Sequence, residues 1–171
     1  MRSKGAAYRI AYYGLMLGFA MICGYVEALI PINIGLPGMK LGIANIVAMW
    51  LVLNKKYISA FVINTGRIVL CGILFGNAVG MFYSLCGGTL AVAAMVLASR
   101  CRAFSDIGVG ISGAVLHNIG QITAAWLVIG SAAAAYLPPL MVAGVLTGAL
   151  TGFLTAVLSK NAAVTKLGRS I

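Results

Sequence analysis

The sequence contains almost no acidic residues: Asp and Glu together number two in 171 positions, against twelve Lys and Arg. Charged residues of both signs make up 8% of the chain, whereas about 25% is typical of a soluble domain. This scarcity of charge excludes an ordinary soluble fold. The scarcity of carboxylates also leaves most of the positive charge without a partner in the chain.

Several functional motifs are absent as well. No GxxxxGK[ST] loop is present, so the chain has no P-loop of its own. A literal GxGxxG match at Gly108 to Gly113 follows no predicted strand and precedes no acidic residue, so we expect neither a dinucleotide nor any other cofactor. The cysteines lack CxxC spacing, and we expect free thiols and no metal. They are Cys23, Cys71, Cys86 and Cys101.

Long apolar runs dominate what is present, and 62% of the residues are apolar. Six runs are long enough, or nearly so, to cross a hydrocarbon core about 30 Å thick at about 1.5 Å per residue. They lack the alternation of barrel strands. We therefore predict an all-α integral membrane protein with one domain, residues 1–171, and six transmembrane helices. The predicted helices are Ile10 to Ile30, Leu41 to Leu53, Ile58 to Phe75, Ala78 to Ala98, Ile107 to Ile129 and Tyr136 to Leu158.

One of these runs, Leu41 to Leu53, is short and is expected to span obliquely or only in part. The basic residues gather before the first helix, after the last one, and in alternate connections. This is the positive-inside pattern, and it predicts cytoplasmic termini in a multi-pass protein of a bacterial cytoplasmic membrane rather than nucleic-acid binding. The clustered residues are Arg2, Lys4, Arg9, Lys55, Lys56, Arg100, Arg102, Lys160, Lys166 and Arg169.

One arginine, Arg67, lies near the middle of a predicted membrane helix, where a cation costs roughly 2.5 to 3.5 kcal/mol. It should therefore face protein, water or a ligand. Asn64 precedes Arg67 by three residues, and His117 lies at similar depth with Gln121 four residues later, so each helix has a polar face. The candidate solute-binding residues are Glu27, Lys40, Asn45, Asn64, Arg67, His117, Asn118 and Gln121.

These residues outline a cavity that opens outward and carries a positive balance, which favours an anionic or strongly hydrogen-bonding solute. Two alternatives remain open. The histidine and the asparagines can act only as hydrogen-bonded packing residues between helices. Glu27 can form a structural ion pair with either Lys40 or Arg67.

Small residues recur at four-residue spacing in the first predicted helix, at Ala20, Gly24 and Ala28. In a bilayer, such a stripe lets two helix backbones approach closely. The stripe either packs within the bundle or docks a partner membrane protein.

Three segments carry a resemblance to a known family: GYVEALIP (Gly24 to Pro31), PGMKLGIANIV (Pro37 to Val47) and LHNIGQ (Leu116 to Gln121). They resemble a bacterial family of six-helix membrane proteins known both as heptaprenyl diphosphate synthase component I and as the Gx transporter family. That family is similar to the S components of energy-coupling factor vitamin transporters. The resemblance implies solute binding near the outer face, a gating loop at Pro31 to Met39, and docking of a coupling subunit on the first helix. AxxxG at Ala20 and Gly24 replaces the usual AxxxA.

The leading hypothesis is a non-enzymatic, substrate-binding membrane subunit of an energy-coupling-factor-like transporter that imports a small vitamin-like or anionic metabolite. Its partners would be the solute, membrane lipid, and a transmembrane coupling subunit with ATPase subunits. The alternative is a non-catalytic membrane accessory subunit in prenyl diphosphate, quinone or flavin-linked electron transfer metabolism. Prenyl chain elongation itself requires two aspartate-rich motifs, which two carboxylates cannot form. A third reading is a structural partner with a polar core.

Overall fold

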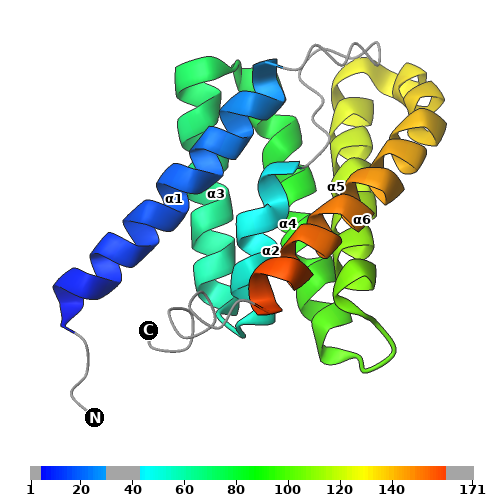
Figure 1. Cartoon of the computed structure of the whole chain (residues 1–171). Helices are drawn as coiled ribbons and strands as arrows, with labels where there is room; N and C mark the ends of the chain where they lie inside the picture. Colours follow the sequence, from blue (N-terminus) through cyan, green and yellow to red (C-terminus); the bar gives the residue numbers. More distant parts are fainter. Residues whose placement is uncertain (1–4, 30–42, 161–171) are drawn as a thin grey trace.

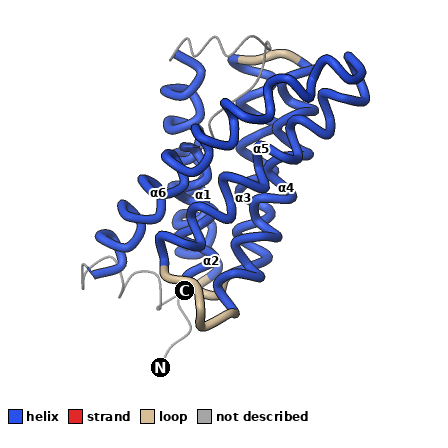
Figure 2. The backbone as a smooth tube through the Cα atoms, turned by 90° about the vertical axis from the view of Figure 1, so that its right-hand side faces the viewer, coloured by secondary structure: helices blue, strands red, loops and turns tan. Residues whose placement is uncertain are grey.

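The computed structural model describes residues 5–29 and 43–160, and this part of the chain is helical without any strand (Figures 1 and 2). Five long α-helices are present with one short helix, α2, and the direction of the chain alternates from each of these six helices to the next, so that α1 and α3 run the same way. Two 3-10 helices, η1 and η2, precede the short helix and the last long helix. The elements are α1 (Ala6–Leu29), η1 (Ile43–Asn45), α2 (Ile46–Leu53), α3 (Tyr57–Phe75), α4 (Ala78–Arg100), α5 (Asp106–Ile129), η2 (Gly130–Tyr136) and α6 (Leu137–Lys160).

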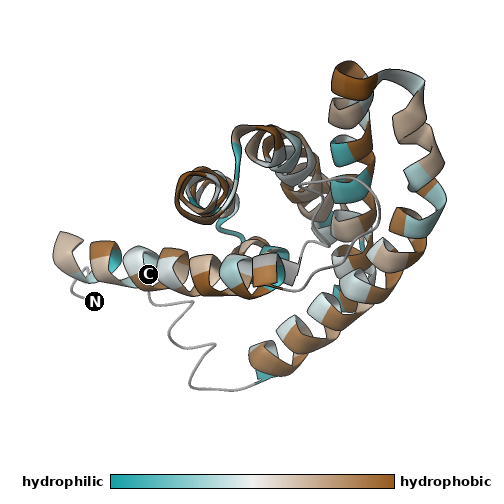
Figure 3. Cartoon of the chain, turned by 90° about the horizontal axis from the view of Figure 1, so that it is seen from above, coloured by the Kyte–Doolittle hydropathy of each residue, from teal (hydrophilic) through white to brown (hydrophobic). Residues whose placement is uncertain are grey.

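The long helices make this a multi-pass membrane protein. Four segments are long and apolar enough to cross a bilayer, and the last of them, of 55 residues, contains both α5 and α6. Hydrophobic residues extend along every long helix (Figure 3), and many of their large apolar side chains are exposed on the outside of the protein. The segments are Ala6–Glu27, Tyr57–Phe75, Ala78–Arg100 and Asp106–Lys160.

The second predicted helix is the one that the structure changes. Its α-helical part, α2, has 8 residues and is about 12 Å long, so it is too short to cross the hydrocarbon core by itself. It lies among α1, α3, α4 and α6 (Figure 1), and residues 46–52 are all buried. A helix that is apolar on every side is typical of a position inside a protein core or a membrane, and here neighbouring helices cover it. The interpretation that this segment spans only in part therefore fits the structure.

The other helices begin and end within four residues of the predicted positions, and α1 differs most because it begins at Ala6 rather than Ile10. Two starts are fixed by side-chain caps. Asn77 Oδ1 accepts a hydrogen bond from the Gly80 amide at 2.7 Å, and Ser105 Oγ accepts one from the Gly108 amide at 3.2 Å. These polar residues satisfy amide groups that the first turn of a helix leaves free.

Glycines let α4, α5 and α6 pack closely. A Cβ atom added at Gly120 would lie 2.8 Å from the Gly87 Cα, and one at Gly152 would lie 2.6 Å from the Ile107 Cα. Backbone contact of this kind is a common basis of helix association in a bilayer, because the hydrophobic effect contributes little to association of helices that are already surrounded by lipid.

The described basic residues, apart from Arg67, all lie toward one end of the bundle (Figure 1). We call this the basic end. It comprises the start of α1, the α2–α3 and α4–α5 connections, and the end of α6. At the opposite end, the described residues 75–78 and 129–137 carry no charged side chain. The uneven distribution of charge along the sequence thus becomes a polarity of the whole bundle.

Candidate solute-binding site

Arg67 lies in the middle of α3, about 15 Å along the helix from Tyr57, and its side chain is only 3% exposed. Its Nη2 donates a hydrogen bond to Asn64 Oδ1 at 2.9 Å and another to Asn45 Oδ1 at 3.4 Å. Among the described residues, Arg67 Nε has no hydrogen-bond partner. The buried cation is therefore held by neutral amide oxygens and retains a donor for another acceptor.

The short second helix explains how Asn45 reaches this depth. Asn45 ends η1, directly before α2, and α2 occupies only the half of the bundle nearer the basic end. Its side chain is therefore delivered to the middle of the protein, where Nδ2 lies 3.5 Å from His117 Nδ1 on α5. Asn45 donates to this nitrogen in the tautomer that leaves Nδ1 unprotonated. A hydrogen-bonded chain from Arg67 through Asn45 to His117 thus joins α3, η1 and α5.

Glu27 and Gly24 bring α1 to the same cluster. The Glu27 side chain is 7% exposed, and its carboxylate interacts electrostatically with Arg67. A Cβ atom at Gly24 would lie 3.6 Å from Arg67 Nη1, so the guanidinium packs close to the backbone of α1. Of the two predicted partners for Glu27, Arg67 is therefore nearby, whereas Lys40 lies outside the described residues.

The polar residues of α5 divide between two neighbours. A Cβ atom at Gly87 of α4 would lie 2.6 Å from the His117 carbonyl oxygen and 2.9 Å from Gln121 Cγ, so His117 and Gln121 share the face toward α4. Asn118 instead faces α6, where its Nδ2 donates a hydrogen bond to the Leu140 carbonyl oxygen. Consecutive residues on a helix are about 100° apart, which accounts for the separation.

The structure therefore gathers most of the predicted site residues in one cluster and places Asn118 on a different face of α5. Glu27, Asn45, Asn64, Arg67 and His117 form the group that we call the Arg67 cluster, with Gln121 on the same face of α5. Asn118 lies on another face of α5, where its Nδ2 contacts α6, and its buried Oδ1 has no hydrogen-bond partner among the described residues, so its role in binding a solute stays a prediction.

The predicted docking stripe on α1 faces the bundle. Ala20 and Gly24 are both buried, and Gly24 packs against Arg67 and Cys71 of α3. The side chain of Ala28 lies outside the described part. The described members of this stripe thus contribute to internal packing, and docking of a partner subunit on the stripe stays a prediction.

Sequence reasoning missed Ser84 on α4. The residue is 2% exposed, and its hydroxyl has no hydrogen-bond partner among the described residues. Ser84 shares one face of α4 with Gly87 and Gly88, and a Cβ atom at Gly88 would lie 2.7 Å from Asn64 Nδ2. The sequence did contain a signal for this face of α4. One small polar residue and two glycines stand at positions 84, 87 and 88, and small residues on one helix face leave room for polar neighbours.

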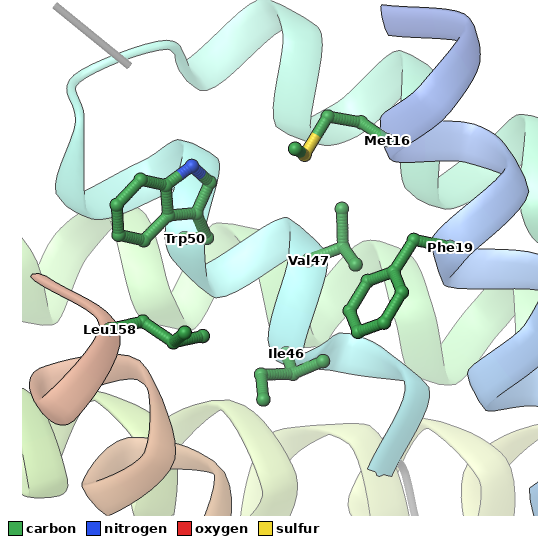
Figure 4. Close-up of a pocket in the computed structure, with 6 residues that line it drawn as sticks. All are labelled: Met16, Phe19, Ile46, Val47, Trp50 and Leu158. Carbon is green, nitrogen blue, oxygen red and sulfur yellow. The ribbon is translucent and has the colours of Figure 1, made fainter. Parts of the chain in front are cut away.

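The arrangement suits recognition of an anion. A guanidinium presents a planar set of donors that matches carboxylate or phosphate, and its charge acts strongly where water is excluded. The nearby groove between α1, α2 and α6 has a volume of about 200 Å³ and an apolar lining, so it does not offer a second polar site (Figure 4). It is lined by Met16, Phe19, Ile46, Val47, Trp50 and Leu158.

A sequence profile of the heptaprenyl diphosphate synthase component I family matches residues 16–158, which is most of the chain. The chain belongs to this family. The match contains all the described residues of the Arg67 cluster, and it confirms the family resemblance seen in the sequence. No curated protein and no solved structure matches the chain.

Proposed function

We propose that this member of the heptaprenyl diphosphate synthase component I family is the solute-binding membrane subunit of an energy-coupling-factor-like importer. The observation that carries the proposal is the buried Arg67, which is held in mid-helix by Asn45 and Asn64 and keeps a free donor at Nε among the described residues. A buried cation is costly in a membrane, so its retention favours a role in binding. The protein is proposed to bind the solute without transforming it.

The proposed topology has six crossings, in which α2 forms the inner part of the second. Both termini lie in the cytoplasm, and the membrane is the bacterial inner membrane. The support is the basic end, because Lys and Arg are enriched on the cytoplasmic side of membrane proteins. The Arg67 cluster then lies in the middle of the bilayer, with Glu27 toward the outer side.

The proposed solute is a small metabolite with a carboxylate or phosphate group. Its anion would pair with Arg67, while Asn45, Asn64 and His117 would fix its orientation through hydrogen bonds. Lys40 and the Pro31 to Met39 segment, which lie outside the described residues, would close over the solute from the outer side. Release inward would require a coupling subunit and ATPase subunits, since this chain has no P-loop.

Native mass spectrometry of the detergent-purified protein tests this proposal. The wild type should retain a small anionic molecule, and Arg67→Gln should lose it because the charge is gone. Arg102→Gln, which removes an exposed arginine at the basic end, is the matched control and should retain the molecule. Equal retention by Arg67→Gln would overturn the role assigned to Arg67.

The family's own name favours a second candidate, an accessory subunit of prenyl diphosphate metabolism. With two carboxylates in the chain, the synthase chemistry would have to reside in another subunit. Affinity purification from native membranes separates the two candidates. Co-purification of a coupling subunit and ATPases supports the importer, whereas co-purification of a prenyl-chain-elongating enzyme, with no bound solute, supports the accessory subunit.

A further inference from the structure

An apolar groove lies between α3 and α4 on the outside of the bundle, and it extends toward the basic end. Its volume is about 510 Å³, and its lining contains no charged residue. On α4 it extends from Thr89 to Leu97, about 12 Å along the helix. The lining residues are Tyr57, Ile58, Phe61, Val62, Thr89, Val92, Ala93, Val96 and Leu97.

The end of the groove nearest the basic end is cationic. Tyr57 lines the groove, and the guanidinium carbon of Arg100 lies 4.9 Å from the centre of its ring. This cation–π contact holds Arg100 at the groove. Lys56 directly precedes Tyr57, and the exposed Lys55 precedes Lys56. One positive side chain, Arg100, therefore lies at this end of the apolar groove, and two lysines stand directly before Tyr57 in the chain.

Helix dipoles do not decide the sign of the potential here. The N-terminus of α3 and the C-terminus of α4 lie together at this point, so their opposite partial charges largely offset each other. Lys56 is the N-cap residue of α3, and its side chain has only hydrogen-bond donors, so it adds no negative charge or acceptor at this helix end. The full charges of the lysine and the arginine dominate.

We propose that this groove binds an anionic phospholipid of the membrane. The phosphate lies between Lys56 and Arg100, and an acyl chain follows the apolar lining past Phe61 and Val96. Charge complementarity identifies the occupant. The headgroup of a lipid with net negative charge matches the cationic mouth, and its acyl chain matches the apolar lining. A zwitterionic lipid brings a cation of its own to the same mouth, and a free phosphate leaves the groove unfilled. Basic pockets between membrane helices are known to select anionic headgroups.

A second groove provides an internal comparison. The groove between α4 and α5 is also apolar, with a volume of about 460 Å³, but its lining residues, among them Phe82, Cys86 and Leu127, lie toward the opposite end of the bundle. The described residues at that end carry no positively charged side chain. Only the groove with the cationic mouth is assigned to an anionic lipid, and the assignment does not depend on the Arg67 cluster.

Titration of the detergent-purified full chain with phosphatidylglycerol and with phosphatidylcholine, followed by native mass spectrometry, tests the proposal. The double variant Lys56→Gln/Arg100→Gln should weaken phosphatidylglycerol binding by about tenfold or more, because two surface cations are lost. The control Arg9→Gln/Lys160→Gln removes the same charge from α1 and α6 at the same end and should leave binding within about twofold. Equal weakening by the control pair would overturn the site.

The groove itself is tested with charges intact. Ala93→Phe fills the channel from an exposed position and should reduce phosphatidylglycerol binding, whereas Val142→Phe on the exposed face of α6 should not. Arg100→Lys keeps the charge and should retain most of the binding. Phosphatidylcholine binding as tight as that of phosphatidylglycerol would overturn the proposal. Displacement of phosphatidylglycerol by a lower concentration of farnesyl diphosphate would also overturn it, by assigning the groove to another class of lipid.

Discussion

At the scale of single residues, the proposed function depends on how one buried cation, Arg67, is satisfied. Arg67 has hydrogen bonds to two amide oxygens from different parts of the chain, Asn64 on its own helix and Asn45 on η1. Asn64 could be expected from the sequence because residues three apart share a helix face. The contact with Asn45 depends on where α2 begins, and local spacing does not contain that information.

The contributions of Asn64 and Arg67 to stability should be energetically coupled. Asn64→Ala should destabilise the protein by about 1 to 3 kcal/mol, because it removes the 2.9 Å acceptor from a buried charge. In an Arg67→Leu background the same change should cost much less, since no charge needs the acceptor. Reversible unfolding in mixed micelles measures all four proteins of this cycle. Additive effects would contradict the coupling.

At the scale of helices, glycines determine how closely α4 approaches α5 and α3. Gly87 lies against the His117 carbonyl and Gln121, and Gly88 lies against Asn64, so these two positions support the Arg67 cluster from α4. The stripes of small residues predict close approach of helices. They do not predict which helices meet, and the described members of the stripe on α1, Ala20 and Gly24, face the bundle.

The sign of a glycine-to-alanine effect should differ between buried and open sites. Gly87→Ala should destabilise the protein, because the new Cβ would lie 2.6 Å from a carbonyl oxygen and force α4 away from α5. Gly18→Ala, whose Cβ would meet nothing within 4 Å, should be neutral or stabilising by up to about 1 kcal/mol. Thermal unfolding of both variants in one detergent provides the comparison. Destabilisation of equal size would contradict the assignment of the Gly87 effect to its close contact with α5.

At the scale of the whole molecule, charge gives the bundle a direction. The basic residues are spread through the sequence, and the alternating helices bring those that the structure describes to one end, apart from Arg67. The proposed cytoplasmic termini rest on this polarity, and the proposed lipid groove also has its mouth at the basic end. A reversed orientation would place the basic end outside and is disfavoured by the positive-inside rule.

The orientation can be measured with the exposed Cys101 in the α4–α5 connection. A membrane-impermeant maleimide should label Cys101 in inside-out vesicles and leave it unlabelled in intact cells stripped of outer barriers. Cys101→Ser should abolish this labelling, and Ser131→Cys, added to it at the other end of the bundle, should be labelled from outside. The opposite pattern would invert the proposed topology.

The sequence by itself determined the membrane class, the five long helices and the polarity of charge, because hydrophobic length and the placement of Lys and Arg are local properties of the chain. It also marked Arg67, since a cation in an apolar run is visible without a structure. The tertiary structure decided the short α2, the separation of Asn118 from His117, the inward face of Ala20 and Gly24, and the position of Gly88 beside Asn64. These features depend on which helices become neighbours, and periodicity fixes position along a helix far better than position around the bundle.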